Sequence, residues 1–182
     1  MKLRTLFSLC LGGIALTALA QGGYQDGVDY YNADRFEKAR TILQKTLNDA
    51  STNKAVSYFY LGSLDLREGN IQGAQTNFNN GIAADSDYGY NYVGLGEIAL
   101  KNGNKKEAED QFKAAINTNK KDAALVAAVA RAYANVDPVL YAKEIEKNIE
   151  KGMKMSKNKE PQIYVLQGDL AKNEDKGLAA GY

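Results

Sequence analysis

Apolar and small residues recur along this chain at the spacing of amphipathic helices, and the whole arrangement repeats. Two copies lie in the same register, 34 positions apart. The first copy contains Tyr58, Leu61, Gly62, Ala74 and Phe78, and the second contains Tyr92, Leu95, Gly96, Ala108 and Phe112. A period of this length, divided between two short amphipathic segments, predicts an array of helix pairs.

The polar positions between the two segments of a copy predict where the helices end. Gly69-Asn70 and, one period later, Gly103-Asn104 can adopt left-handed conformations that end one helix and start the next. Each copy therefore predicts two antiparallel helices joined by a tight turn. Because a single pair cannot bury its apolar face, neighbouring pairs are expected to stack.

Glycine in the middle of a helix needs a physical reason, because it costs about 1 kcal/mol relative to alanine. Gly62 and Gly96 occupy this position in the first helix of their copies, and Gly27 and Gly168 fall at the same phase. We expect another backbone to approach closely there. Phe78 and its counterpart in the next copy are expected to fill the space that the small residues leave.

These positions resemble the tetratricopeptide repeat, whose pattern is an aromatic residue, Leu-Gly three positions later, and then Ala, an aromatic residue and Ala in the second helix. Ala115 supplies the last Ala of one copy, and Gly81 stands in for it in the other. The resemblance implies an all-α, right-handed superhelical solenoid of antiparallel helix pairs, with about four full repeats and a truncated fifth. The expected repeats lie near residues 21–53, 54–88, 89–122, 123–160 and 161–182, the last one incomplete.

The outer repeats depart from the pattern. In the fourth, Ala130 takes the place of Gly, and Asp137-Pro138 replaces the Gly-Asn turn. Extra residues in this repeat are expected to lengthen its second helix, over 139–155, or the segment that follows. The fifth repeat reaches Tyr182 soon after its first helix. We therefore expect further repeats or another domain to continue the chain.

Residues 1–20 have the pattern of a secretory signal peptide. Lys2 and Arg4 form a basic start, residues 5–19 carry no charge, and the segment ends in Ala18-Leu19-Ala20. We expect cleavage after residue 20 and export, which places the protein in the periplasm or at the outer membrane. An uncleaved anchor is the alternative, although the apolar run is short for a membrane span of about 20 residues.

Composition narrows the chemistry that the exported chain can perform. The full sequence has 23 basic and 22 acidic residues, no His and a single Cys, Cys10, which lies inside the expected signal peptide. Removing that segment leaves 21 basic and 22 acidic residues, so neither nucleic acid nor an anionic membrane is expected as a partner. Triads that depend on His and nucleophilic Cys are excluded. We predict no catalytic residue, no metal site and no cofactor.

The remaining candidate surface is a groove. In tetratricopeptide arrays one stripe of the first helices lines the concave face, and the resemblance implies the same role for matching positions here. The candidate partner-binding residues are Tyr24, Val28, Tyr31, Phe59, Tyr60, Ser63, Arg67, Tyr90, Val93, Glu97, Lys101, Arg131 and Asn135. Aromatic walls around a floor of small residues suit a peptide or a helix of a partner protein.

The resemblance thus implies a non-enzymatic scaffold of the bacterial periplasm or cell envelope that binds other proteins. An alternative is a targeting arm at the start of a longer protein, with an enzymatic or cell-wall-binding domain beyond residue 182. Self-association is a third possibility, in which the last helix pairs with a second copy.

Overall fold

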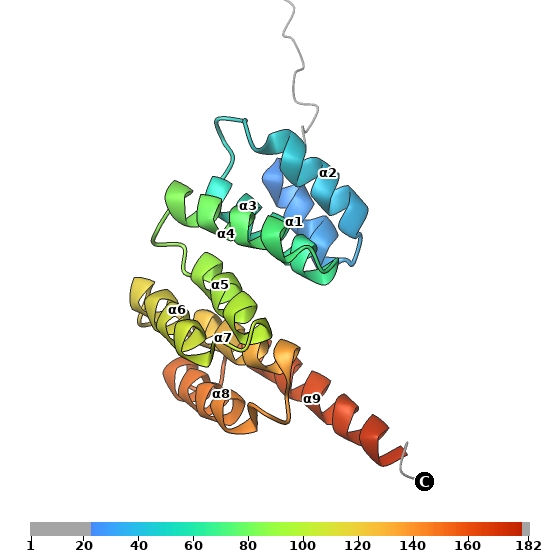
Figure 1. Ribbon diagram of the computed structural model, residues 1–182, viewed down its shortest axis with the longest axis vertical. Coiled ribbons are helices and arrows are strands. Elements are labelled where there is room, and N and C mark those ends of the chain that lie inside the picture. Colours follow the sequence, from blue (N-terminus) through green and yellow to red (C-terminus); the bar gives the residue numbers. More distant parts are fainter. Residues whose placement is uncertain (1–22, 180–182) are drawn as a thin grey trace, which may run out of the picture.

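The computed structural model describes residues 23–179, with side chains up to residue 172. Within that range the chain is entirely helical outside its turns (Figure 1). The helices are α1 (Tyr24–Asn32), α2 (Phe36–Thr46), α3 (Lys54–Arg67), α4 (Ile71–Ala84), α5 (Tyr90–Lys101), α6 (Lys105–Thr118), α7 (Ala123–Val136), α8 (Ala142–Ser156) and α9 (Pro161–Ala179). The expected signal peptide, residues 1–20, lies outside the described residues and remains a prediction.

The helices pack as successive hairpins. α1 packs on α2, α3 on α4, α5 on α6 and α7 on α8, and each first helix also contacts the first helix of the next pair. The first helices α1, α3, α5, α7 and α9 therefore form one continuous layer, with the second helices outside it (Figure 1). This arrangement confirms the predicted all-α repeat fold, with four helix pairs followed by a ninth helix.

The turns inside the second and third pairs follow the sequence pattern closely. Gly69 and Gly103 both have φ of 77°, a conformation that glycine adopts without steric cost. The Asn70 side chain caps α4 by accepting a hydrogen bond from the Gly73 N–H at 3.0 Å. Asn104 does not cap α6 in this way, and its amide instead donates to Glu107. The glycine of each pair therefore makes the turn, and only one of the two asparagines caps a helix.

The mid-helix glycines lie under the side chains of the facing helix. A Cβ atom added at Gly62 would lie 2.6 Å from Cε1 of Phe78, and one added at Gly96 would lie 2.3 Å from Cε1 of Phe112. At Gly62 and Gly96 the expectation of a close backbone approach is therefore wrong, because the nearest atoms belong to aromatic rings. At Gly27 an added Cβ would meet the side chain of Leu43 at 2.7 Å and its backbone N at 3.3 Å. Phe78 also lies against Gly94 of the next pair, where an added Cβ would meet its ring at 2.4 Å.

The fourth pair places its extra residues differently from the prediction. α8 begins at Ala142, so residues 137–141 form a longer connection than residues 68–70 of the second pair. The Asp137 carboxylate accepts hydrogen bonds from the N–H groups of Val139 and Leu140, at 3.0 and 2.8 Å. The Asp-Pro sequence therefore builds a wider turn, and the second helix does not extend back to Val139.

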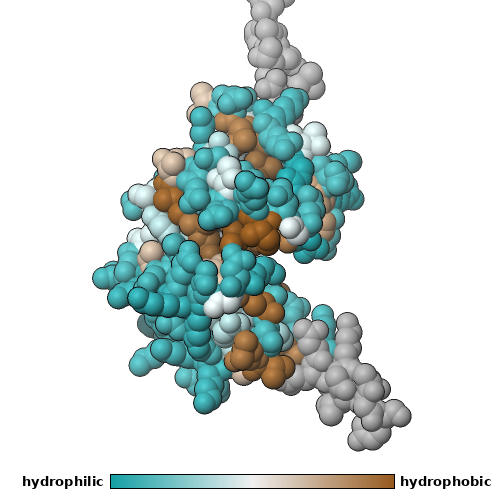
Figure 2. Space-filling view, viewed as in Figure 1, coloured by the Kyte–Doolittle hydropathy of each residue, from teal (hydrophilic) through white to brown (hydrophobic). Residues whose placement is uncertain are grey.

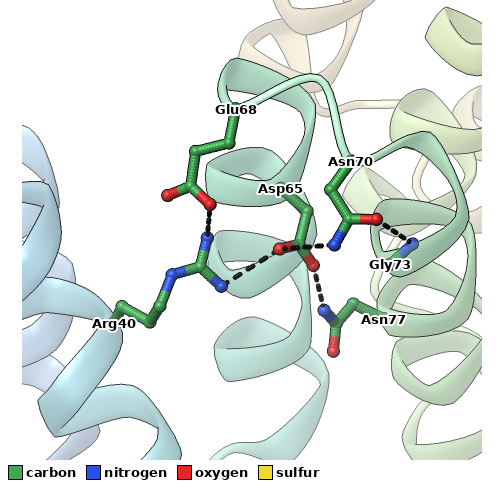
Figure 3. A network of polar contacts seen from close by, with 6 residues as sticks. All are labelled: Arg40, Asp65, Glu68, Asn70, Gly73 and Asn77. Atoms are coloured by element: carbon green, nitrogen blue, oxygen red, sulfur yellow. Dashed lines mark hydrogen bonds and ion pairs between the residues drawn. The ribbon is translucent and has the colours of Figure 1, made fainter.

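A polar network joins the first two pairs (Figure 3). Asp65 of α3 is 5% exposed and accepts hydrogen bonds from Asn77 at 2.6 Å and from Arg40 of α2 at 3.1 Å. Arg40 also forms an ion pair with Glu68 at 2.9 Å, and Asn70 lies within 3.4 Å of the Asp65 carboxylate. Because a buried carboxylate is costly without partners, this network fixes how α2, α3 and α4 meet.

A buried asparagine connects the second pair to the third. Asn91 of α5 is fully buried and donates a hydrogen bond to the Ala55 carbonyl at 3.1 Å. Its side chain occupies the space beside Gly81, where an added Cβ would lie 2.4 Å from the amide atoms. Gly81 therefore replaces the usual Ala of the pattern because a polar side chain from the next pair lies there.

No helix within residues 23–179 is long and apolar enough to cross a membrane.

Candidate partner-binding groove

The layer of first helices carries two adjoining cavities. One has a volume of about 510 Å³ and lies over α1, α3, α5 and α7, and the other, of about 690 Å³, extends to the start of α9. Their shared lining residues are Tyr31, Phe59, Arg67, Ala128, Arg131 and Asn135. We call the combined surface the concave groove. In the space-filling view the outline is indented between the half formed by α1–α4 and the half that carries α9 (Figure 2).

One wall of the concave groove is aromatic. The ring of Tyr31 on α1 lies 4.9 Å from that of Tyr60 on α3, and Tyr60 lies 5.2 Å from Phe59. Phe59 in turn lies 5.6 Å from Tyr90 on α5, and Tyr88 lies 5.2 Å from Tyr90. Successive rings meet edge-on or tilted, as aromatic pairs prefer. The wall is therefore a continuous belt that spans three helices.

The tyrosines of this belt are half-buried. Burial raises the pKa of Tyr31, Tyr60, Tyr88 and Tyr90 above the ordinary phenol value. All four phenols are therefore neutral at physiological pH. The belt offers apolar faces together with hydroxyl groups, a combination common in protein-binding surfaces.

The opposite wall of the concave groove is polar. The Glu97 carboxylate on α5 accepts a hydrogen bond from the Asn135 amide of α7 at 3.1 Å, and the Lys101 ammonium lies 3.9 Å from it. Burial raises the pKa of Glu97, although Asn135 and Lys101 act in the opposite direction. Arg131 of α7 pairs with Asp169 of α9 at 2.5 Å. This wall therefore carries both signs of charge in a fixed arrangement.

An arginine lies between the two walls. The guanidinium of Arg67 lies 4.1 Å from the ring centroid of Phe36, close enough for a cation–π contact. Arg67 lines both cavities of the concave groove. It is positioned by an aromatic ring and still presents donors to the groove.

The structure brings most of the predicted binding residues together. Those that line one or both cavities are Tyr31, Phe59, Tyr60, Ser63, Arg67, Tyr90, Val93, Glu97, Lys101, Arg131 and Asn135. Tyr24 and Val28 line neither cavity. Val28 is 6% exposed and belongs to the core beneath α1, together with Leu43 and Leu61. The first repeat therefore contributes Tyr31 to the concave groove, while its earlier residues fill the core.

Two of the lining residues that sequence reasoning missed lie in turns. Tyr88 and Glu160 lie in the turns that precede α5 and α9, and both line the larger cavity. The helical stripe used for prediction contains only positions within helices, so turn residues escaped it. For Tyr88 the usable signal was its place two positions before Tyr90, because both rings point into the same space.

The groove offers binding more readily than chemistry. Among residues with described side chains, no group of three or more His, Cys, Asp or Glu residues could hold a metal ion. The Glu97 carboxylate on the polar wall is held by the Asn135 amide and the Lys101 ammonium. The helices, their stacking and the groove together define a helical-repeat protein with a groove lined by aromatic and charged side chains.

Comparison with known proteins identifies the repeat in the middle of the chain. Residues 65–132 match the family model described as Tetratricopeptide repeat. The helix pairs on either side of this segment continue the same packing. No curated protein sequence matches the chain closely enough to count as a relative.

Solved structures support the fold. A thermophilic tetratricopeptide repeat protein from Thermus thermophilus, TTC0263, aligns with a TM-score of 0.60 and 20% identity, over 77% of this chain and 75% of that one. A crystal structure of MamA aligns with a TM-score of 0.50 and 20% identity, over 75% of this chain and 77% of that one. Proteins with this fold generally mediate protein–protein interactions and are typically non-enzymatic.

Proposed function

We propose that this protein is an exported scaffold of the bacterial cell envelope that binds a peptide or a helix of a partner protein in the concave groove. The observation that carries the proposal is the continuity of the two cavities, which share two aromatic residues and two arginines from α1, α3 and α7, namely Tyr31, Phe59, Arg67 and Arg131. A surface that extends over four first helices suits an elongated ligand better than a compact small molecule.

The two walls suggest how such a ligand is held. The belt around Phe59 and Tyr60 supplies apolar area to an anchoring side chain, and small residues such as Ala127 and Ala128 leave room on the floor. Arg67, Lys101, Arg131 and Glu97 fix the orientation of polar groups on the ligand. The aromatic wall then supplies most of the affinity for the ligand, and the polar wall sets the orientation in which the ligand binds.

Export is supported by the pattern of residues 1–20 and by the location of the only Cys within it. Cellular fractionation combined with N-terminal sequencing tests this part. We expect the protein in the envelope fraction, beginning at Gln21. Recovery of a chain that still begins at Met1, in the cytoplasm, would rule out export.

The groove is tested by removing two rings of the belt. We expect Tyr60→Ala combined with Tyr90→Ala to weaken capture of partners from an envelope extract, while circular dichroism shows the helical content of the parent. A matched control is Tyr30→Ala with Tyr164→Ala, because neither of these tyrosines lines the concave groove. Equal capture by both double variants would remove the groove from the proposal.

A photo-reactive residue locates the contact directly. Placed at Ser63, inside the smaller cavity, it is expected to cross-link the partner. Placed at Thr76, which is exposed on the second helix α4, it is expected not to. Cross-linking from Thr76 alone would move the interaction to the outer face.

A further inference from the structure

We propose a second interaction surface on the outer layer, a groove between α6 and α8 that binds an acidic amphipathic helix of a partner protein. This outer groove has walls from two second helices and a base that includes residues of α7. It shares no lining residue with the concave groove. It therefore does not depend on the function proposed above.

The outer groove has an apolar floor. It encloses about 600 Å³, and Phe112, Ile116, Val129 and Tyr133 lie along its base. Burial raises the pKa of Tyr133 to about 12, so its phenol stays neutral. One end of the groove is closed where Lys105 of α6 bonds to Glu144 of α8 at 2.5 Å. Phe112, Val129 and Tyr133 are only 2–4% exposed, so the accessible apolar surface is that of half-buried Ile116 and of the aliphatic stems of the lysines around it.

The rims of the outer groove are basic. Lys143, Lys147 and Lys151 line one side, on α8, and Lys113 lines the other, on α6. All four are exposed, and none forms an ion pair with another residue whose side chain is described. The lining also contains Glu109 and Glu144, and Glu144 is already bonded to Lys105. The groove thus has an excess of positive charge above an apolar base.

This arrangement of lysines is not required by the fold. Lys143, Lys147 and Lys151 recur at every fourth position, so their side chains lie on one face of α8. α4 has the same structural role in its own pair and contains no charged residue over its 14 positions. A basic stripe that a sister helix lacks indicates a partner of opposite charge.

The floor and the neighbouring charges favour an acidic helix over a polyanion. A nucleic acid or an anionic membrane would gain nothing from the apolar floor of the outer groove. Either would also approach Glu146 and Glu150, which lie on α8 outside the groove lining. An amphipathic helix can place apolar side chains on Ile116 and on the lysine stems while its carboxylates meet the ammonium groups on both rims.

The test uses the full chain and a synthetic amphipathic peptide built from Glu, Leu and Ala, with Lys replacing Glu in a second peptide. We expect the Glu peptide to bind, with affinity falling as salt rises, and the Lys peptide not to bind. Lys147→Glu with Lys151→Glu is expected to weaken binding by about tenfold or more. Lys106→Glu with Lys120→Glu makes the same change in net charge outside the groove and is expected to have little effect.

Hydrogen exchange locates the peptide. Protection of α6 and α8 supports the proposal, whereas protection confined to α3, α5 and α7 would place the peptide in the concave groove and overturn it. Equal loss of binding in the two double variants would also overturn it, because it would show a general charge effect. Tighter binding of duplex DNA or of phosphatidylglycerol vesicles than of the Glu peptide would assign the lysines to another class of partner.

Discussion

The second and third helix pairs differ from the C-terminal part of the array in what lies opposite the small position of the first helix. In the middle of the molecule Gly62 and Gly96 are each covered by a phenylalanine ring. In the fourth pair Ala130 takes this place and is fully buried, and the facing helix α8 contains no aromatic residue. At Gly168 of α9 no atom lies within 4 Å of the position of an added Cβ.

The comparison shows that one position of the repeat meets three different environments. Where a ring covers it, even a methyl group is excluded, and glycine is a steric requirement. Where the facing helix has no aromatic residue, a fully buried alanine is accommodated. Where nothing faces it, glycine gives no packing benefit and retains its cost in helix propensity. The size of the residue is therefore set by its neighbour across the pair, and substitutions should separate the three cases.

The largest effect is expected from Phe78→Ala. The ring is fully buried and lies between Gly62 of its own pair and Gly94 of the next, so its removal opens a cavity across a boundary between repeats. Truncation of a buried Phe typically costs about 3–5 kcal/mol. Urea denaturation followed by circular dichroism measures the loss. A change below about 1 kcal/mol would show that the ring does not hold the two pairs together.

Gly96→Leu is the opposite change, an addition of volume at a covered site. An added Cβ already lies 2.3 Å from the Phe112 ring, so the helices must separate. Overpacking of this kind costs about 1–3 kcal/mol, and more where the facing side chain cannot move. We expect a marked drop in the thermal midpoint. A melting curve equal to that of the parent would contradict the helix-pair geometry.

The repeat architecture could be predicted because its signals are local and occur twice. Leu-Gly, the Gly-Asn turn and the Ala and Phe of the second helix each constrain the backbone or the core by themselves, and their recurrence fixes the period. The prediction that Phe78 fills the space beside Gly62 is confirmed. That the ring, and not a backbone, makes the closest approach could not be predicted, because glycine at that position allows either one.

The concave groove was predictable as a stripe, with errors where the stripe ends. Val28 has the correct helical phase, but its side chain packs in the core with Leu43 and Leu61 and is therefore not on the surface. Tyr88 belongs to a turn and has no helical phase at all. The role of Asn91 depends on a carbonyl 36 positions away, and sequence periodicity contains no information about that hydrogen bond.

A smaller effect is expected at Glu97, and it depends on pH. Burial raises the folded-state pKa of this carboxyl above its unfolded value of 4.5. Between the two pKa values the folded chain binds more protons than the unfolded chain, so stability falls as pH rises through that interval. Glu97→Gln is expected to remove this dependence and to raise stability at neutral pH. Thermal melts of both proteins across the interval test the sign, and an opposite slope would show that Asn135 and Lys101 outweigh burial.

The smallest effect, with the opposite sign to the first two, is expected for Gly168→Ala. The position lies inside α9, and an added Cβ meets nothing within 4 Å, so the methyl group should cost no packing energy. Alanine should then stabilise the helix by about 0.5–1 kcal/mol, the usual difference between the two residues. Gly62→Ala is the matched control, and it should destabilise the array because its Cβ meets Phe78 at 2.6 Å. If Gly168→Ala also destabilises, another helix covers α9 in solution, and the contrast between the middle and the C-terminal part of the array disappears.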